Sequence, residues 1–315
     1  MRWLGRGKRQ PGWLALGLHR EHVELVHVKR AVSGMPVVAF CDSYRREGPE
    51  SETLARLRKE LKLQQYRCTT LLGSHDYQLH HLEAPSVPPA EMLAAVGWRL
   101  KDIIDYPIEA ATIDILDVPG DRDAAPTSRC IFAVTARNDV IQSCLKPFDA
   151  SQIALEAIDI MELAQRNIAA LYETEGQGIA MLAFYASDGI LTFTRGAEMF
   201  LSRRIEIALP ELIAEDAVER EQHFERIALS VQRSLDHFER EYSSVPLAKL
   251  LIAPLPRDIG LQDYLATHID GIVESVDLSQ VMDIAAVPEL KHPESQSRYF
   301  PMIGAALRGE EAAAA

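Results

Sequence analysis

The pattern of apolar positions predicts three strands, a helix and a fourth strand at the start of the chain. Apolar or alternating runs at 13–18, 23–30 and 36–43 predict strands that are separated by turns. The next segment, PESETLARLRKELKL, carries leucines at helical spacing and predicts a helix. A short apolar run at 68–74 then predicts a buried strand. The order of elements in this part is therefore βββαβ.

The same order of elements recurs in the second half of the chain. Runs at 179–184, 189–195 and 199–208 predict three strands, and 247–255 predicts a buried strand that a further helix follows. The long helix predicted between them, 217–242, has an apolar stripe at steps of three and four: Phe224, Ile227, Val231, Leu235, Phe238 and Tyr242. Element order repeats although residue identity does not, which suggests a duplicated unit. Two such sheets would enclose a cleft between domains, where ligands usually bind.

A segment with a different pattern lies between the two repeats. It contains a predicted helix, 90–106, which Pro89 would begin and Pro107 would end. The apolar stripe of that helix is Leu93, Val96, Leu100, Ile103 and Ile104. A strand precedes the helix, another follows it, and CIFAVTARNDVIQSCLKPF predicts one more strand and helix. These elements predict an inserted α+β subdomain of about 75 residues.

Charge and composition exclude several classes of protein. The chain has 315 residues and a net charge of −13, which argues against a nucleic-acid-binding protein. Residues 1–12 are the exception, because this tail gathers basic and apolar side chains: Arg2, Trp3, Leu4, Arg6, Lys8 and Arg9. The tail is either a solvated terminus or a weak peripheral contact with an anionic membrane, at about 1 kcal/mol per basic residue.

The chain has the pattern expected of a cytoplasmic protein. No apolar run reaches the roughly 18 residues of a membrane span, and no apolar stretch follows the basic start as in a secretion signal. The cysteines are widely spaced and form no C-x-x-C pair: Cys41, Cys68, Cys130 and Cys144. We therefore expect reduced thiols and no disulfide framework.

Two polar clusters are candidates for chemistry, and neither matches a known site pattern. The first contains His75, Asp76, His80 and His81. Adjacent strand residues point to opposite faces, and no H-E-x-x-H spacing is present. The second surrounds a Pro-Gly turn without the spacing of a calcium loop, and contains Asp114, Asp117, Asp121 and Asp123. We interpret both as solvated surfaces and expect no metal site and no catalytic residue.

Several stretches in family order resemble the PilM family of actin-like type IV pilus assembly proteins. They are LEAPSVPPAEMLAAVGWRLKDIIDYPIEAATIDILDV, LEAIDIMELAQRN, LSVQRSLDHFEREY and FPMIGAALR. They are most similar to the divergent MshI-type members of that family, from mannose-sensitive haemagglutinin (MSHA) pilus biogenesis. None of these stretches is a catalytic motif. The resemblance therefore implies a fold and a family more strongly than an activity.

The resemblance implies an α/β, actin-like fold of two domains built from duplicated RNase H-like βββαβα units. The first actin-like subdomain would take 13–74, 149–177 and 297–310, after the basic tail 1–12. The inserted α+β subdomain would take 75–148, and the second actin-like domain 178–289. Residues 311–315 would form a disordered tail.

The three elements that bind nucleotide in related proteins are altered in this chain. The resemblance places Gly17 and Ala183 where the two phosphate hairpins carry aspartate, and His19 and Tyr185 where they carry glycine. The Gly-rich adenosine turn is replaced by APLP, in which Pro254 has no N–H and Leu255 adds a side chain. Glycine would let the backbone approach phosphate, and a tyrosine fills that space. We therefore expect no cofactor and no ATP binding of the usual kind.

The resemblance also implies a protein partner. PilM-like proteins hold the cytoplasmic N-terminal segment of PilN, or its MSHA counterpart, in a cleft beside the inserted subdomain. Position and chemistry suggest four groove residues: Trp98, Ile103, Ile104 and Tyr106. Trp98 lies off the apolar stripe, so it either packs on a neighbouring subdomain or anchors a partner peptide.

Three hypotheses for function follow. The first is a non-enzymatic scaffold at the cytoplasmic face of the inner membrane, which binds a PilN-like protein and contacts the pilus motor ATPase. The second is a PilM-like ATPase with unusual nucleotide contacts, in which Asp159 or Asp188 replaces the missing carboxylates. The third is the cytoplasmic domain of an L-type type II secretion protein. The ending EEAAAA argues against the third, because such a protein normally continues into a membrane span.

Overall fold

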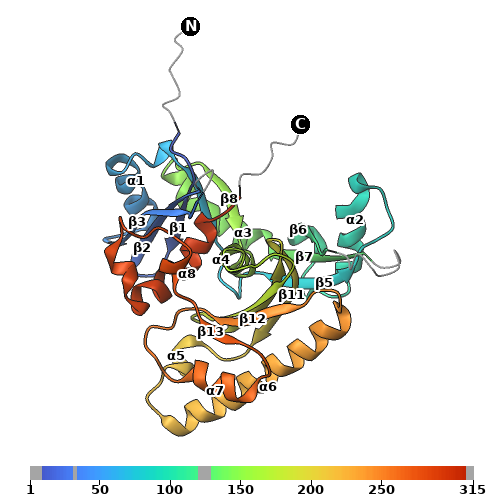
Figure 1. Ribbon diagram of the computed structural model, residues 1–315. Helices are drawn as coiled ribbons and strands as arrows, with labels where there is room; N and C mark the ends of the chain where they lie inside the picture. Colours follow the sequence, from blue (N-terminus) through green and yellow to red (C-terminus); the bar gives the residue numbers. More distant parts are fainter. Residues whose placement is uncertain (1–8, 31–33, 120–128, 310–315) are drawn as a thin grey trace.

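Two five-stranded mixed sheets with the same strand order form most of the fold (Figure 1). The computed structural model describes residues 9–30, 34–119 and 129–309. The first sheet has the order β3-β2-β1-β4-β8: Val37–Arg45, His22–Lys29, Trp13–Leu18, Arg67–Leu71 and Leu155–Asp159. The second has the order β11-β10-β9-β12-β13: Glu198–Ile205, Gly189–Arg195, Gly178–Phe184, Leu247–Ile252 and Val273–Ser275.

Strand directions match as well as strand order. In each sheet the first three strands of the repeat are antiparallel neighbours, and the remaining two join them in parallel. The βββαβ order predicted for both halves is therefore present. Strand β4 ends at Leu71 and β12 at Ile252, earlier than predicted, because the apolar runs continue into the loops that follow.

Two helices pack between the sheets. Helix α8 (Pro293–Ala306) covers β1, β2 and β4, while α4 (Met161–Ala169) covers β9 and β10, and the two helices contact each other. The contact is close at Gly304, where a Cβ atom would lie 2.3 Å from the carbonyl oxygen of Ala164. Nδ2 of Asn167 donates to the Gly304 carbonyl at 2.9 Å. A glycine is needed here because any side chain would push the helices apart.

The outer faces of the sheets are covered by other helices. Helix α1 (Glu50–Glu60) and the end of α3 (Asn138–Ala150) pack on the first sheet, and α6 (Ala217–Glu241) and α7 (Leu261–His268) pack on the second. The predicted stripe of α6 is confirmed, since all its residues but the half-buried Leu235 are buried in one core. The remaining short elements are α5 (Leu209–Leu212), η1 (Leu63–Gln65), η3 (Leu278–Gln280) and η4 (Pro288–Lys291).

The inserted segment forms a separate three-stranded antiparallel sheet of order β5-β7-β6. Its strands are Gln78–Glu83, Cys130–Arg137 and Ala111–Asp117, and its elements include α2 (Pro89–Leu100) and η2 (Ile108–Ala110). Helix α2 ends at Leu100, not at Tyr106 as predicted. After Leu100 the chain forms turns that bury Ile104 against the sheet, while Leu93 and Ile103 of the predicted stripe are about half exposed.

Two further predictions concern the membrane and the cysteines. Among the described residues, no helix combines the length and apolarity that a membrane span requires. The four cysteines are free, and Cys41 and Cys68 are buried.

In the basic tail only residues 9–12 are described, and there Arg9 pairs with Glu156 at 2.9 Å. The tail residues Arg2, Trp3, Leu4, Arg6 and Lys8 lie outside the described residues, as do Asp121 and Asp123.

Candidate functional site

The first hairpin carries an imidazole where the resemblance expects a glycine of a phosphate-binding turn. Gly17 pairs in register with Glu24, and His19 lies in the turn that follows β1. A Cβ atom on Gly17 would lie 3.0 Å from Nε2 of His19 and 3.0 Å from Sδ of Met302. The space beside Gly17 is therefore taken by an imidazole and a thioether, and a carboxylate side chain would not fit without their movement.

In the second hairpin the tyrosine is part of the core between the sheets. Ala183 and Tyr185 are buried, and the Tyr185 hydroxyl donates to Oε1 of Gln165 at 3.1 Å. Nε2 of Gln165 donates in turn to Oγ1 of Thr192 at 2.9 Å. Burial raises the pKa of Tyr185 well above its usual value, so the hydroxyl stays protonated. The aromatic ring fills the position where the resemblance expects bare backbone.

The third loop borders a cavity of its own. Pro254 and Leu255 line a space of about 410 Å³ together with the start of α7, Asp277 and Lys291. This volume is in the range of small-molecule sites. Among the described residues that line it, none comes from either hairpin. The three elements expected to form one nucleotide site therefore do not share one cavity.

Buried carboxylates at the end of β8, in α4 and in the turn of the second hairpin each face an arginine. Asp159 accepts from Arg308 at 3.1 Å, and Arg204 lies 3.6 Å from Glu162 and 3.7 Å from Asp188. Burial raises the pKa of Asp159 against the opposing charge of Arg308. Asp159 and Asp188, the carboxylates suggested for an ATPase, are thus already paired. Glu162 was missed from the sequence because nothing in its spacing distinguishes it from a surface glutamate.

The Glu162 carboxylate also joins the inserted segment to the rest of the chain. The Tyr77 hydroxyl, at the start of that segment, donates to Glu162. Burial raises the pKa of Glu162, while the Tyr77 hydrogen bond and the Arg204 charge oppose the rise. Nearby, the hydroxyls of Ser74 and Ser187 lie 2.6 Å apart and join the loops that follow β4 and β9. This polar network holds the first repeat, the insertion and the second repeat together.

A cavity of about 300 Å³ lies between the inserted sheet and the first repeat. Most of its lining is apolar and comes from β6, β7, α3, β8 and α4: Leu116, Val134, Ile141, Ile158 and Leu163. The Asp159–Arg308 pair borders it. This is the region where the resemblance expects a partner peptide. The sequence identified none of these apolar residues as a site, because they come from five elements that only the fold brings together.

The four residues suggested as a peptide groove do not line this cavity. Trp98 is 73% exposed and Ile103 is 50% exposed, whereas Ile104 is only 8% exposed and belongs to the core of the inserted sheet. Tyr106 is half-buried, with the Arg137 guanidinium 5.6 Å from its ring centre. The prediction that Trp98 packs on a neighbouring subdomain is therefore wrong, and Ile104 is not exposed to a partner in this structure. A partner groove at these four residues stays a prediction.

The polar clusters considered from the sequence are dispersed. Nε2 of His80 lies 3.3 Å from Oγ1 of Thr135, while the His81 ring packs against Phe132 with centroids 5.2 Å apart. His75 is exposed and Asp76 accepts from the Gly73 amide. In the acidic loop, Asp114 is exposed and Asp117 pairs with Arg129 at 2.6 Å. A different cluster, at the first hairpin, was missed and is described below.

No protein-family model and no curated protein matches the chain, but several solved structures are similar to it. A chain of the PilM-PilN type IV pilus biogenesis complex is 19% identical with a TM-score of 0.69, over 95% of this chain and 99% of that chain. A Bacteroides thetaiotaomicron protein with an actin-like ATPase fold and unknown function is 9% identical with a TM-score of 0.50, over 92% and 99%.

The cytoplasmic domain of EpsL, an inner membrane component of the type II secretion system of Vibrio cholerae, is also similar. It is 14% identical with a TM-score of 0.46, over 76% of this chain and 81% of that chain. At these identities the comparisons establish the fold alone. With the two matching mixed sheets, they confirm that the chain has an α/β, actin-like fold.

Proposed function

We propose that this chain is a non-enzymatic scaffold of type IV pilus assembly, of the MshI type, in the cytoplasm at the inner membrane. It holds the cytoplasmic N-terminal segment of a PilN-like bitopic membrane protein and contacts the pilus motor ATPase. Residues 1–12 add a weak contact with the membrane. The likeness to a chain of the PilM-PilN complex supports this proposal, as does the sequence resemblance.

The observation that carries the proposal is the apolar cavity beside the inserted sheet. Its walls belong to strands and helices of the inserted sheet and of the first repeat. An apolar side chain of a bound segment would fill the space between Leu116, Ile141 and Leu163, and a few side chains buried in such pockets carry most of the affinity of an interface. The Asp159–Arg308 pair at its border offers a carboxylate and a guanidinium to the backbone of the segment.

The proposal that the chain is not an enzyme is supported by the two hairpins. The His19 imidazole lies beside Gly17, and Tyr185 is in the core. A triphosphate in the usual pose needs room and backbone N–H groups at these positions.

The test is a binding titration with labelled N-terminal peptides of the membrane proteins encoded beside this chain. We expect one peptide to bind with 1:1 stoichiometry. Ile141→Glu places a carboxylate in the apolar cavity and should weaken binding about tenfold or more. The matched control is Val218→Glu, an aliphatic-to-glutamate change at an exposed position of α6, which should leave affinity unchanged.

A second variant separates the cavity from the surface of α2. Trp98→Ala removes the exposed indole and should change affinity less than about twofold. Loss of binding in Trp98→Ala with full binding in Ile141→Glu would show that the peptide binds at α2 and not in the cavity. If no peptide binds the wild-type chain, the scaffold proposal is rejected.

Nucleotide binding is the second candidate function, and the 410 Å³ cavity beside Pro254 and Leu255 favours it. A thermal-shift titration with Mg-ATP tests it, because ligand at 100 times its Kd adds about 2.7 kcal/mol of stability. A shift that Lys291→Gln abolishes would establish binding in this cavity. We expect no shift at millimolar ATP.

A further inference from the structure

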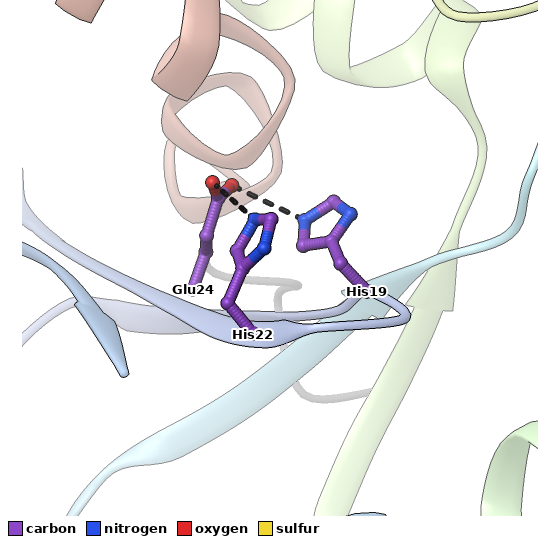
Figure 2. A group of neighbouring side chains, drawn as sticks. All are labelled: His19, His22 and Glu24. Carbon is purple, nitrogen blue, oxygen red and sulfur yellow. Dashed lines mark hydrogen bonds and ion pairs between the residues drawn. The ribbon is translucent and has the colours of Figure 1, made fainter. Parts of the chain in front are cut away.

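Two histidines and a glutamate converge at the turn between β1 and β2. Figure 2 shows both imidazoles directed at the carboxylate of Glu24. Nε2 of His19 lies 3.2 Å from Oε2 of Glu24, and Nε2 of His22 lies 3.1 Å from Oε1. The imidazole rings are stacked with centroids 4.5 Å apart. The three ligand atoms thus lie within 4.8 Å of one another.

The backbone sets two of the three residues in place. His22 and Glu24 are two residues apart on β2, so their side chains leave the same face of the strand. Glu24 is buried, while His22 is partly exposed and His19, in the turn, is exposed. The cluster therefore has a fixed carboxylate at its base and two imidazoles on the solvent side, where an ion can enter.

We propose that His19, His22 and Glu24 form a binding site for a divalent cation of the Zn²⁺ class. Two imidazole nitrogens and a carboxylate oxygen form a ligand set that zinc uses in proteins. Mg²⁺ and Ca²⁺ prefer oxygen ligands throughout, so the histidines select against them. A search of the described residues for three or more histidine, cysteine or acidic side chains close enough to share one ion finds this group.

The distances fit such an ion. Zinc bonds of about 2.0–2.1 Å in a tetrahedron place neighbouring ligand atoms about 3.3 Å apart. Nε2 of His19 lies 3.2 Å from Oε2 of Glu24, which is close to that value. Nε2 of His22 lies 3.1 Å from the other oxygen, Oε1, and the ligand atoms all lie within 4.8 Å of one another, so a rotation of the two imidazoles would bring both nitrogens to an ion bound at Oε2. Three protein ligands leave one position for water or for a side chain of a partner.

Arg298 is an outer partner of the same carboxylate. Its Nε donates to Oε1 of Glu24 at 2.6 Å and its Nη2 to Oγ of Ser43 at 2.7 Å. With Oε1 held by Arg298, Oε2 is the oxygen available to the cation, and such an outer contact orients a ligating carboxylate. Arg46 donates to the His19 carbonyl at 2.7 Å and fixes the turn. Both arginines carry positive charge, which weakens cation binding without removing any ligand.

The test uses the full chain without a histidine tag, freed of metal by a chelator and then titrated with Co²⁺ and Zn²⁺. We expect one Co²⁺ per chain with the visible absorption of a low-coordinate site, and its displacement by Zn²⁺. His19→Gln and His22→Gln should each weaken Zn²⁺ binding about tenfold or more. His268→Gln, an exposed histidine of α7, is the matched control and should bind as the wild type does.

Two results would overturn the proposal. One is wild-type affinity no higher than that of the His19→Gln/His22→Gln double variant, which would make the cluster an ion-pair network alone. The other is an unchanged 1:1 complex in the double variant, which would put the metal elsewhere on the chain. Because His19 is exposed and His22 partly so, both variants should fold, and circular dichroism checks this directly.

Discussion

The Tyr185 hydroxyl donates a hydrogen bond to Oε1 of Gln165 at 3.1 Å, inside the core between the two five-stranded sheets. Gln165 lies on α4 and Tyr185 follows β9, so the bond joins the helix layer to the second hairpin. Both residues are buried, which makes each polar atom costly to leave without a partner. The hairpin that would contact phosphate in a nucleotide-binding relative therefore helps to stabilise the core in this chain.

Tyr185→Phe should lower the free energy of unfolding. The substitution keeps the ring and leaves Oε1 of Gln165 buried without its donor, at a cost of about 1–3 kcal/mol. Urea unfolding followed by circular dichroism measures the change. Tyr264→Phe is the control, because its hydroxyl makes no hydrogen bond among the described residues and should cost less than about 0.5 kcal/mol. Equal stability of the two variants would mean that the Gln165 contact contributes nothing.

Gly304→Ala should destabilise the protein at the α4–α8 contact. The new Cβ atom would meet the Ala164 carbonyl oxygen at 2.3 Å, and two backbones cannot yield as a flexible side chain can. Overpacking of this kind costs about 1–3 kcal/mol, occasionally more. Thermal and urea unfolding measure the loss, with Gly309→Ala as control, since nothing lies within 4 Å of its Cβ position. A Gly304→Ala variant as stable as the control would contradict the close packing.

Glu162→Gln should change how stability depends on pH. Burial raises the folded-state pKa of Glu162 above its usual value of 4.5, so the native state holds this proton more tightly than the unfolded state. The wild type therefore loses stability as pH rises from about 4.5 through the raised pKa, and glutamine has no such loss. We expect the stability of the variant, relative to the wild type, to increase with pH across this window. Urea unfolding at several pH values measures it, and a constant or falling difference would contradict the raised pKa.

Long regular elements were predictable from the sequence because each packs against a single surface of the core, which keeps the spacing of its apolar residues regular. Helix α6 has 25 residues, and its apolar stripe faces a single sheet, so the period of three and four is undisturbed. The βββαβ order of elements along each repeat follows from the same local patterns. Helix α2 was harder, since apolar residues continue beyond Leu100 but enter the core from turns. Periodicity identifies an apolar position and does not show whether the backbone that carries it is helical.

The candidate sites depend on contacts that no local pattern contains. The cavity beside the inserted sheet combines Leu116, Ile141 and Leu163 from three separate elements. At the first hairpin, the predicted strand began at residue 23, and only the structure places His22 and Glu24 on one face of β2 with His19 beside them. Arg298 is 274 residues away from Glu24 in the chain. The resemblance directed attention to the two hairpins, and only the structure shows which side chains occupy them.

Arg308→Gln should destabilise the protein more at neutral pH than in acid. Arg308 is the main charged partner of Asp159, whose carboxylate is buried, and its removal leaves that charge only the Ile160 amide and the weaker field of Arg166. Breaking a buried pair in this way costs about 3–5 kcal/mol. Burial already raises the pKa of Asp159 above its usual value of 3.8, and without Arg308 it rises further.

A raised folded-state pKa means that stability is retained in acid and lost as pH rises through the window above 3.8. The cost of Arg308→Gln should therefore be smallest near pH 4 and grow toward pH 7, as measured by urea unfolding at each pH. The double variant Arg308→Gln/Asp159→Asn has no carboxylate to ionise, so its stability relative to the wild type should not fall as pH rises from 4 to 7, in contrast to that of Arg308→Gln. A cost of Arg308→Gln that is the same at pH 4 and pH 7 would show that Asp159 is not the group left unpaired.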